Sequence, residues 1–146
     1  MSAPPSVVLV KTIPCSAKAA FDAWLSPEAM KHFMCPAQGS SVSQVEVDPR
    51  VGGSFLIMMV VGGTAMPHRG EYLAIERYRR LAFTWRSHHA GEGSHVTLDF
   101  EELGLDQTKL TLTHIGLADP EVCERHRGGW THILGEAERY ASQLAR

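Results

Sequence analysis

The chain contains no asparagine, only three cysteines and no long apolar run, and each shortage excludes a class of protein. Without asparagine there is no acceptor for N-glycosylation. Cys15, Cys35 and Cys123 are far apart and match no metal-ligand spacing, which is typical of buried thiols in a reducing compartment. No stretch reaches the roughly 18 apolar residues that span a bilayer. Since the N-terminus also lacks a signal-peptide pattern, a cytoplasmic protein without membrane insertion is expected.

Basic charge and nucleotide-binding motifs are also scarce. Lys and Arg number 14 against 16 Asp and Glu, giving a formal net charge of −2, whereas nucleic-acid partners require a basic face. No G-x-S-x-G elbow, Walker loop or helix-opening G-x-G-x-x-G occurs, so neither a cofactor nor a catalytic residue is assigned. With 44% hydrophobic residues, the 146 residues are expected to form one globular domain, 1–146.

The first forty residues predict one strand and two short helices. Residues 7–13 are rich in β-branched side chains, and the proline that follows them favours an edge strand. Ser16 is placed to cap a helix that ends near Leu25. The S-P-E sequence at 26–28 starts a second helix, expected to run to about Phe33.

The middle of the chain predicts an antiparallel meander. Strands are expected at 42–47, 54–61, 70–76, 81–87, 94–102 and 109–115, with turns at 48–50, 62–63, 91–93 and 104–107. Alternation in the last three strands directs one set of side chains inward, namely Leu81, Phe83, Trp85, Val96, Leu98, Phe100, Leu110, Leu112 and His114. The 54–61 strand is apolar on both faces, so its inward side is left open.

A long amphipathic helix is predicted after the D-P-E sequence at 119–121. Its apolar stripe runs through Trp130, Ile133, Ala137, Tyr140 and Leu144, and the concave face of the sheet is the surface that it is expected to cover. The G-G pair at 128–129 is interpreted as a close approach of the helix to the sheet or a local kink.

These elements carry a string of motifs: V-E-V-D-P-R-V-G-G-S-F at 45–55, G-E-Y at 70–72, L-A-F-T-W at 81–85 and H-R-G-G-W at 126–130. In this order they resemble the START-like or SRPBCC superfamily and, within it, the Hsp90 ATPase activator homologue (AHSA-like) group, as a single-domain bacterial-type member. The resemblance implies an α+β helix-grip fold, a curved antiparallel sheet wrapped around a long C-terminal helix, with two short helices after the first strand.

The resemblance also implies a hydrophobic cavity between sheet and helix that binds an aromatic, polyketide-like or lipid-like molecule. The residues expected to form this site are Trp24, Phe33, Glu71, Phe83, Trp85, Leu112, His114, Trp130 and Ile133. The aromatic members are equally explained as core. Chaperone cofactors of this group carry a separate N-terminal domain, whereas only the START-like part is expected here. Regulation of a chaperone ATPase is therefore kept as an alternative and not as the main expectation.

His114 and Glu71 are the polar members of the expected site. His114 either bonds a neighbouring carbonyl at the strand end or orients a ligand's carbonyl or hydroxyl. Glu71 is either a surface residue or, if it shares an inward face with Leu73 and Ile75, a carboxylate in an apolar box. A second alternative is therefore an enzyme in which His114 and Glu71 act as base and orienting acid.

The eight histidines raise the question of a metal site. His88, His89 and His95 are predicted on one hairpin, but the only acid at ligand spacing there is Glu92. His126 and His132 stand six residues apart, which does not place both on one helix face. No metal is therefore expected. A homodimer through the sheet edge is left open.

Overall fold

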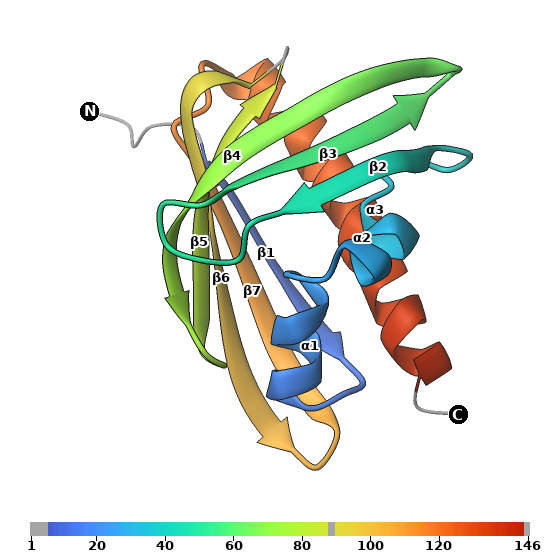
Figure 1. Cartoon of the computed structure of the whole chain (residues 1–146), viewed down its shortest axis with the longest axis vertical. Coiled ribbons are helices and arrows are strands. Elements are labelled where there is room, and N and C mark those ends of the chain that lie inside the picture. Colours follow the sequence, from blue (N-terminus) through green and yellow to red (C-terminus); the bar gives the residue numbers. More distant parts are fainter. Residues whose placement is uncertain (1–5, 88–89, 145–146) are drawn as a thin grey trace.

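The computed structural model describes residues 6–87 and 90–144, which form a curved sheet and three helices (Figure 1). In chain order the elements are β1 (Ser6–Ile13), α1 (Ala17–Ala23), α2 (Pro27–Phe33), β2 (Ser41–Val47), β3 (Ser54–Val61), β4 (Thr64–Glu76), β5 (Arg80–Ser87), β6 (Gly91–Gly104), β7 (Gln107–Ile115) and α3 (Pro120–Leu144). The predicted α+β helix-grip fold is confirmed, including the two short helices after the first strand.

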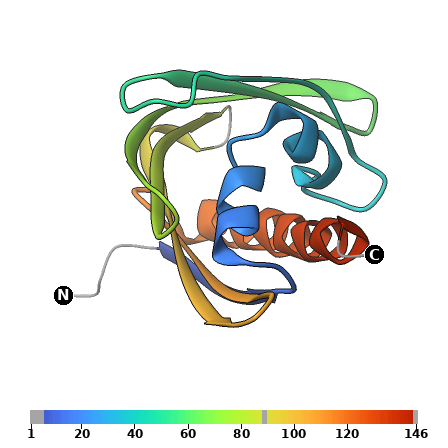
Figure 2. The same ribbon diagram turned by 60° about the horizontal axis from the view of Figure 1, so that its bottom comes forward.

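The strands lie in the order β1-β7-β6-β5-β4-β3-β2, and every neighbouring pair is antiparallel. β1 is therefore an edge strand, as expected. Register shifts in β2/β3, β4/β5 and β5/β6 mark β-bulges, which bend a sheet and increase its twist. Figure 2 shows the result: the sheet curves around the helices, with β2–β4 on one side and β1 and β7 on the other.

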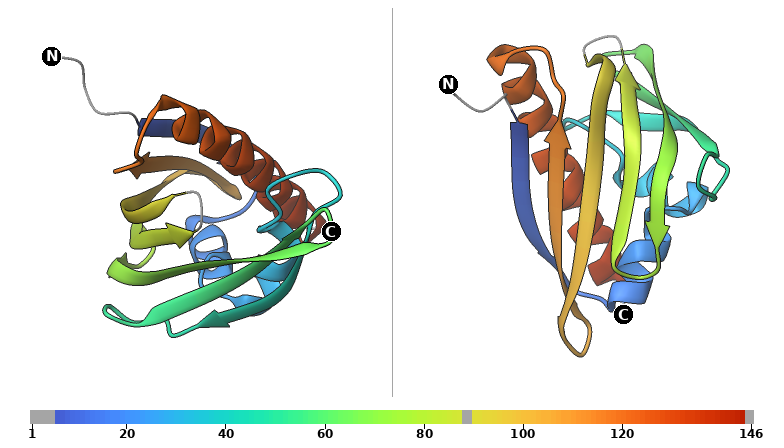
Figure 3. Two further views of the ribbon diagram at one scale, coloured as in Figure 1. Left: turned by 90° about the horizontal axis from the view of Figure 1, so that it is seen from above. Right: turned by 90° about the vertical axis from the view of Figure 1, so that its left-hand side faces the viewer.

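Local sequence signals start all three helices. The Ser16 hydroxyl oxygen accepts a hydrogen bond from the Ala19 backbone N–H at 3.1 Å, and that of Ser26 accepts one from Ala29 at 3.2 Å. At the start of α3, the Asp119 carboxylate accepts from the backbone N–H of Val122 at 2.9 Å. α3 packs against β1, and α2 packs against both β2 and α3 (Figure 3).

The core contains every inward residue predicted for β5, β6 and β7. The open question about β3 is answered as well, because Phe55, Ile57 and Met59 are buried. On α3 the buried residues of the predicted stripe are Trp130, Ile133 and Ala137, joined by Leu134 and Ala141, while Tyr140 is half-buried and Leu144 is exposed.

Two strand boundaries differ from the sequence prediction. β4 begins at Thr64 rather than at residue 70, because Gly62 and Gly63 both adopt positive φ (57° and 80°) and form a tight hairpin. Pairing therefore starts immediately, with Thr64 opposite Val61. β6 already begins at Gly91, where a turn over 91–93 was predicted.

The interpretation of the paired glycines in α3 as a close approach to the sheet was wrong. The helix runs without interruption from Pro120 to Leu144. A Cβ at Gly128 would meet nothing within 4 Å, and one at Gly129 would meet the Pro36 side chain at 3.6 Å. A close backbone approach occurs instead within the sheet, between β4 and β5. A Cβ at Gly70 of the G-E-Y motif would stand 2.0 Å from the Thr84 carbonyl oxygen.

Gly70 and Gly128 should respond oppositely to alanine. Gly70→Ala forces Cβ into a backbone carbonyl and the Phe55 ring, so we expect the free energy of unfolding to fall by about 1–3 kcal/mol or more. Gly128→Ala adds a better helix former in open space and should raise it by about 0.5–1 kcal/mol. Urea unfolding followed by circular dichroism measures both; equal stability of the Gly70→Ala variant and the parent would contradict the close approach.

Candidate functional site

Aromatic rings fill the centre of the space between the sheet and α3. The Trp130 ring lies 4.8 Å from that of Trp85 on β5 and 6.5 Å from that of Trp24, measured between ring centroids. Each of these three side chains is no more than 3% exposed. We call Trp24, Trp85 and Trp130 the tryptophan partition, because the space on its two sides forms separate cavities that share no lining residue.

The first of these cavities, of about 250 Å³, lies between the sheet and the N-terminal half of α3, and we call it the sheet cavity. Its walls are mostly apolar, with a cationic and two imidazole side chains among them. The lining residues are Pro36, Ala37, Met59, Val61, Met66, His68, Trp85, Ser87, Arg125, His126, Gly129, Trp130 and Ile133.

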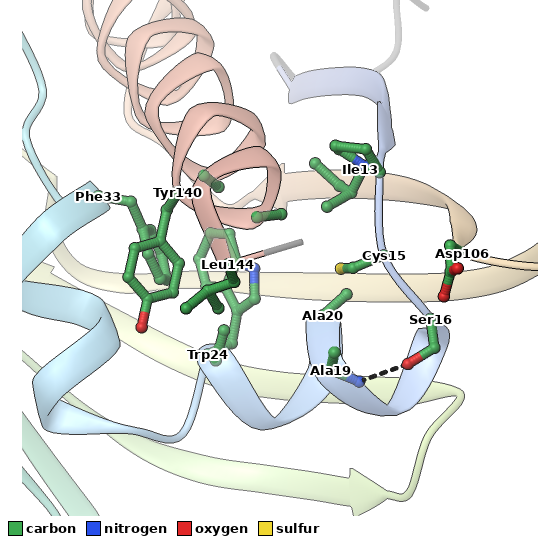
Figure 4. Close-up of a pocket in the computed structure, with 14 residues that line it drawn as sticks. Ile13, Cys15, Ser16, Ala19, Ala20, Trp24, Phe33, Asp106, Tyr140 and Leu144 are labelled. Atoms are coloured by element: carbon green, nitrogen blue, oxygen red, sulfur yellow. Dashed lines mark hydrogen bonds between the residues drawn. The ribbon is translucent and has the colours of Figure 1, made fainter. Parts of the chain in front are cut away.

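The second cavity, of about 290 Å³, lies between α1 and the C-terminal half of α3, and we call it the α1 cavity (Figure 4). The lining residues are Ile13, Pro14, Cys15, Ser16, Ala19, Ala20, Ala23, Trp24, Phe33, Asp106, Ala137, Tyr140, Ala141 and Leu144. A third space, between the tryptophan partition and Phe83, has about 10 Å³ and is too small for an organic ligand.

The expected site residues are thus distributed over two cavities rather than one. Trp85, Trp130 and Ile133 line the sheet cavity. Trp24 and Phe33 line the α1 cavity. The reason is steric. The indole rings that were expected to form the walls of one cavity contact one another across its middle and divide it.

The remaining expected residues lie elsewhere. Phe83 faces only the small void, and Leu112 is fully buried in the core without lining either cavity. Glu71 is exposed, and its neighbour Tyr72 is the inward residue of β4. Of the two alternatives for Glu71, the surface residue is confirmed and the inward carboxylate beside Leu73 and Ile75 is wrong, because Tyr72 faces inward and the bulge after it changes which later residues of β4 do so.

His114 is fully buried, and both of its ring nitrogens are bonded inside the protein. The Trp130 indole N–H donates to Nδ1 at 2.9 Å, and Nε2 lies 3.0 Å from the Ser94 hydroxyl, which itself donates to the Trp85 carbonyl at 2.8 Å. An indole can only donate, so Nδ1 is the acceptor and the proton of the neutral ring is on Nε2. His114 thus bonds a tryptophan and a serine, and offers no nitrogen to a ligand.

The environment keeps this imidazole neutral. Burial, together with the smaller effects of the nearby His126 and His95, lowers the pKa of His114 to about 3. The His126 ring stands edge-on to that of His114, with centroids 5.2 Å apart. Because Glu71 lies on the opposite face of the sheet, with β5 and β6 between its strand and β7, the structure does not form the His114–Glu71 acid–base pair of the enzyme alternative.

Sequence reasoning missed the polar residues of the sheet cavity, Arg125, His126 and His68. One signal was available, because His126 continues the stripe of Trp130 and Ile133 one turn earlier on α3. His126 and His68 each bond a backbone carbonyl through Nδ1, that of Val122 at 2.9 Å and that of Met66 at 3.0 Å. The placement of Arg125 at this cavity depends on the docking of α3 and has no comparable signal.

Two buried polar atoms lack a hydrogen-bond partner among the residues that the structure describes, the Trp85 indole nitrogen and the Tyr72 hydroxyl oxygen. Burial raises the pKa of the Tyr72 hydroxyl, so it remains protonated. Buried donors are normally paired. The unpaired indole N–H is notable because Trp85 forms a wall of the sheet cavity.

No cluster of three or more His, Cys, Asp or Glu side chains that could hold a metal ion occurs in residues 6–87 and 90–144. His88 and His89, which were considered at the sequence level, lie outside the described residues. Within the same ranges, no helix is long and apolar enough to cross a membrane.

The buried neutral His114 makes stability depend on pH. Its pKa falls from 6.5 to about 3 on folding, so acid protonates the unfolded chain first. We expect the free energy of unfolding to decrease below pH 6.5, by up to about 1.4 kcal/mol per pH unit from this group. Gln can accept from Trp130 and donate to Ser94, so His114→Gln should remove that part of the slope in urea unfolding from about pH 6.5 to about pH 4.5. If the free energy of unfolding of the His114→Gln variant depended on pH as strongly as that of the parent, His114 would not be the source of the pH dependence.

Comparisons with known proteins agree with this architecture. Residues 14–141 match the family model described as activator of Hsp90 ATPase homolog 1-like protein. No curated protein matches the sequence. Among solved structures, protein CV1439 from Chromobacterium violaceum is 23% identical with a TM-score of 0.81, the match covering 95% of this chain and 98% of that one.

Two further solved structures are similar. The AHSA1-like protein from Aeromonas hydrophila is 22% identical with a TM-score of 0.79, over 96% of this chain and 94% of that one. PFC0360w from Plasmodium falciparum, described as an HSP90 activator, is 24% identical with a TM-score of 0.75, over 94% and 96%. These likenesses show the fold, and the family model covers most of the chain. The protein therefore belongs to the activator of Hsp90 ATPase homologue 1-like family, as its motifs indicated.

Proposed function

We propose that the protein binds a small, largely apolar molecule with an aromatic part in the sheet cavity. The observation that carries the proposal is the lining of this cavity, which combines Trp130 and Ile133 of α3 with Trp85, Met59 and Met66 of the sheet. Ligand pockets are concave, mostly apolar and furnished with a few polar groups, and thioether side chains adapt to ligands of different shape. A volume of about 250 Å³ suits a ligand at the small end of the usual range.

The polar groups of the cavity favour a ligand that carries an oxygen acceptor. The buried Trp85 indole N–H has no acceptor among the described residues. Arg125 adds a guanidinium from α3, and none of the described lining residues is an Asp or Glu. A carbonyl or carboxylate oxygen on the ligand matches the unpaired indole N–H, and the positive charge of Arg125 favours the carboxylate. An aromatic acid is thus the ligand class that this cavity suits best.

Binding without chemical conversion is the form of this function that we favour. The fully buried His114 is engaged by Trp130 and Ser94. Glu71 is exposed on the outer face of the sheet. The cavity therefore lacks the pair that the enzyme alternative invoked. Cys15, Cys35 and Cys123 are free thiols, which supports a reducing, cytoplasmic location.

Titration with 2-naphthoate tests the proposal. Trp85 and Trp130 line the cavity, so we expect saturable quenching of tryptophan fluorescence. Gly129→Leu places a side chain in the cavity and should weaken binding at least about tenfold, a loss of about 1.4 kcal/mol. Gly128→Leu is the matched control and should leave binding unchanged, because a Cβ at Gly128 meets nothing within 4 Å and Gly128 does not line the cavity. Equal affinities of both variants would refute the site.

The charge preference is tested on the same probe. Arg125 is exposed, so Arg125→Gln should weaken 2-naphthoate binding only about three- to fivefold, as an exposed ion pair contributes. It should leave the affinity for the neutral analogue 2-naphthalenemethanol unchanged. A parallel loss for both compounds would mean that Arg125 acts through packing and not through its charge.

A second candidate function is regulation of a chaperone ATPase. It is favoured by the family model and by the similarity to the P. falciparum protein described as an HSP90 activator. Val8 and Val10, 53% and 58% exposed on β1, give an apolar surface outside both cavities. The binding function predicts no change in the ATPase rate of purified Hsp90. A rise in rate that Val8→Lys removes, and that Val51→Lys at another exposed valine does not, would favour this candidate instead.

A further inference from the structure

We infer that the α1 cavity is a second binding site, separate from the sheet cavity, for a small aromatic molecule that carries a protonated amine. This inference does not depend on the function proposed for the sheet cavity. It rests on how the α1 cavity is formed, on the side chains at its two ends and on the sign of its charge.

The cavity exists because small residues face one another across it. Ala20 and Ala23 of α1 lie on one side, and Ala137 and Ala141 of α3 lie on the other. An alanine side chain ends at Cβ, so the facing helices leave a space that larger side chains would fill. The resulting groove is partly open to solvent, with Ala19, Asp106 and Leu144 exposed at its edge, and measures about 290 Å³. An apolar space of this size is suited to a ligand.

The two ends of the cavity differ in chemistry, as Figure 4 shows. Trp24, Phe33 and Tyr140 gather at one end, with centroid distances of 5.0 Å from Trp24 to Phe33 and 6.3 Å from Phe33 to Tyr140. Cys15 and Asp106 lie toward the other end. The aromatic end offers ring faces and edges for stacking against an aromatic ligand. The ligand is therefore amphipathic, with its polar group toward Asp106.

The charge of the cavity selects a cation. Among the lining residues that the structure describes, Asp106 is the one acidic residue and none is a Lys or Arg. Asp106 forms no ion pair with the described residues. Its negative charge acts in this space, since it adds to burial in raising the pKa of the Cys15 thiol. The sheet cavity has the opposite character, with Arg125 and no acid among its described lining residues. A protonated amine fits the α1 cavity, and a carboxylate does not.

Asp106 is held beside the cavity by the β6–β7 hairpin. Its φ of 58° is in the left-handed region that a hairpin turn requires and that Asp and Asn tolerate. Asp106→Asn therefore removes the charge while keeping the turn. Ala19, exposed among the lining residues, allows the cavity to be blocked without changing the core.

The test is isothermal titration calorimetry with 2-naphthylmethylammonium. We expect saturable binding to the parent protein, weakened at least about tenfold by Ala141→Leu, which fills the space between the helices. Ala19→Leu is the second blocking variant and should act similarly, so the test survives misfolding of the first. Gly129→Leu, in the other cavity, should not change the affinity.

The charge is tested with Asp106→Asn, which should weaken binding of the ammonium probe about three- to fivefold and leave 2-naphthalenemethanol binding unchanged. Absence of binding to the parent protein would overturn the inference. So would binding of the ammonium probe that both blocking variants retain, or that only Gly129→Leu abolishes. Because 2-naphthoate reports on the sheet cavity alone, failure of one proposal is distinguishable from failure of the other.

Discussion

The contact between Trp130 of α3 and the concave face of the sheet is the interaction on which the rest of the structure depends. Its indole ring packs between Trp85 and Trp24, and its N–H donates to the buried His114. One side chain therefore fixes the helix on the sheet, fixes the tautomer of the histidine below it and divides the interior. The hydrogen bonds continue through Ser94 to the backbone of β5. The place where Trp130 contacts the sheet is therefore polar at the indole N–H and apolar around the rings.

This arrangement explains how one fold offers two cavities of opposite charge. α3 forms part of the wall of both cavities, with Gly129 at the sheet cavity and Ala137 and Ala141 at the α1 cavity. At each place the helix carries a residue too small to fill the space opposite it, while Trp130 between them is large enough to close the middle. The charges come from elements outside this contact, Arg125 near the start of α3 and Asp106 in the β6–β7 turn. The charged side chains of the two cavities can therefore change without disturbing the core.

Residue patterns predicted most of the architecture because those patterns are local. The serine caps Ser16 and Ser26, and the alternation in β5 to β7, act through near neighbours in sequence and keep their meaning in the folded protein. Prediction was wrong in β4, where the local sequence is compatible with more than one inward face and more than one strand start. In β4 a bulge placed Tyr72 inward and Glu71 outward, and the tight turn at 62–63 extended the same strand by six residues.

The sequence by itself determined the fold class, the order of the elements, the inward faces of three strands and the family, since each follows from periodicity, caps or ordered motifs. It also singled out the three tryptophans and His114 as residues of the interior. The tertiary structure alone decided that the tryptophans meet and close the expected pocket, that Trp130 and Ser94 saturate His114, and that Arg125 and Asp106 lie at different cavities. These are contacts between residues far apart in the chain, and their geometry depends on how α3 rotates and settles on the sheet, which no spacing along the sequence specifies.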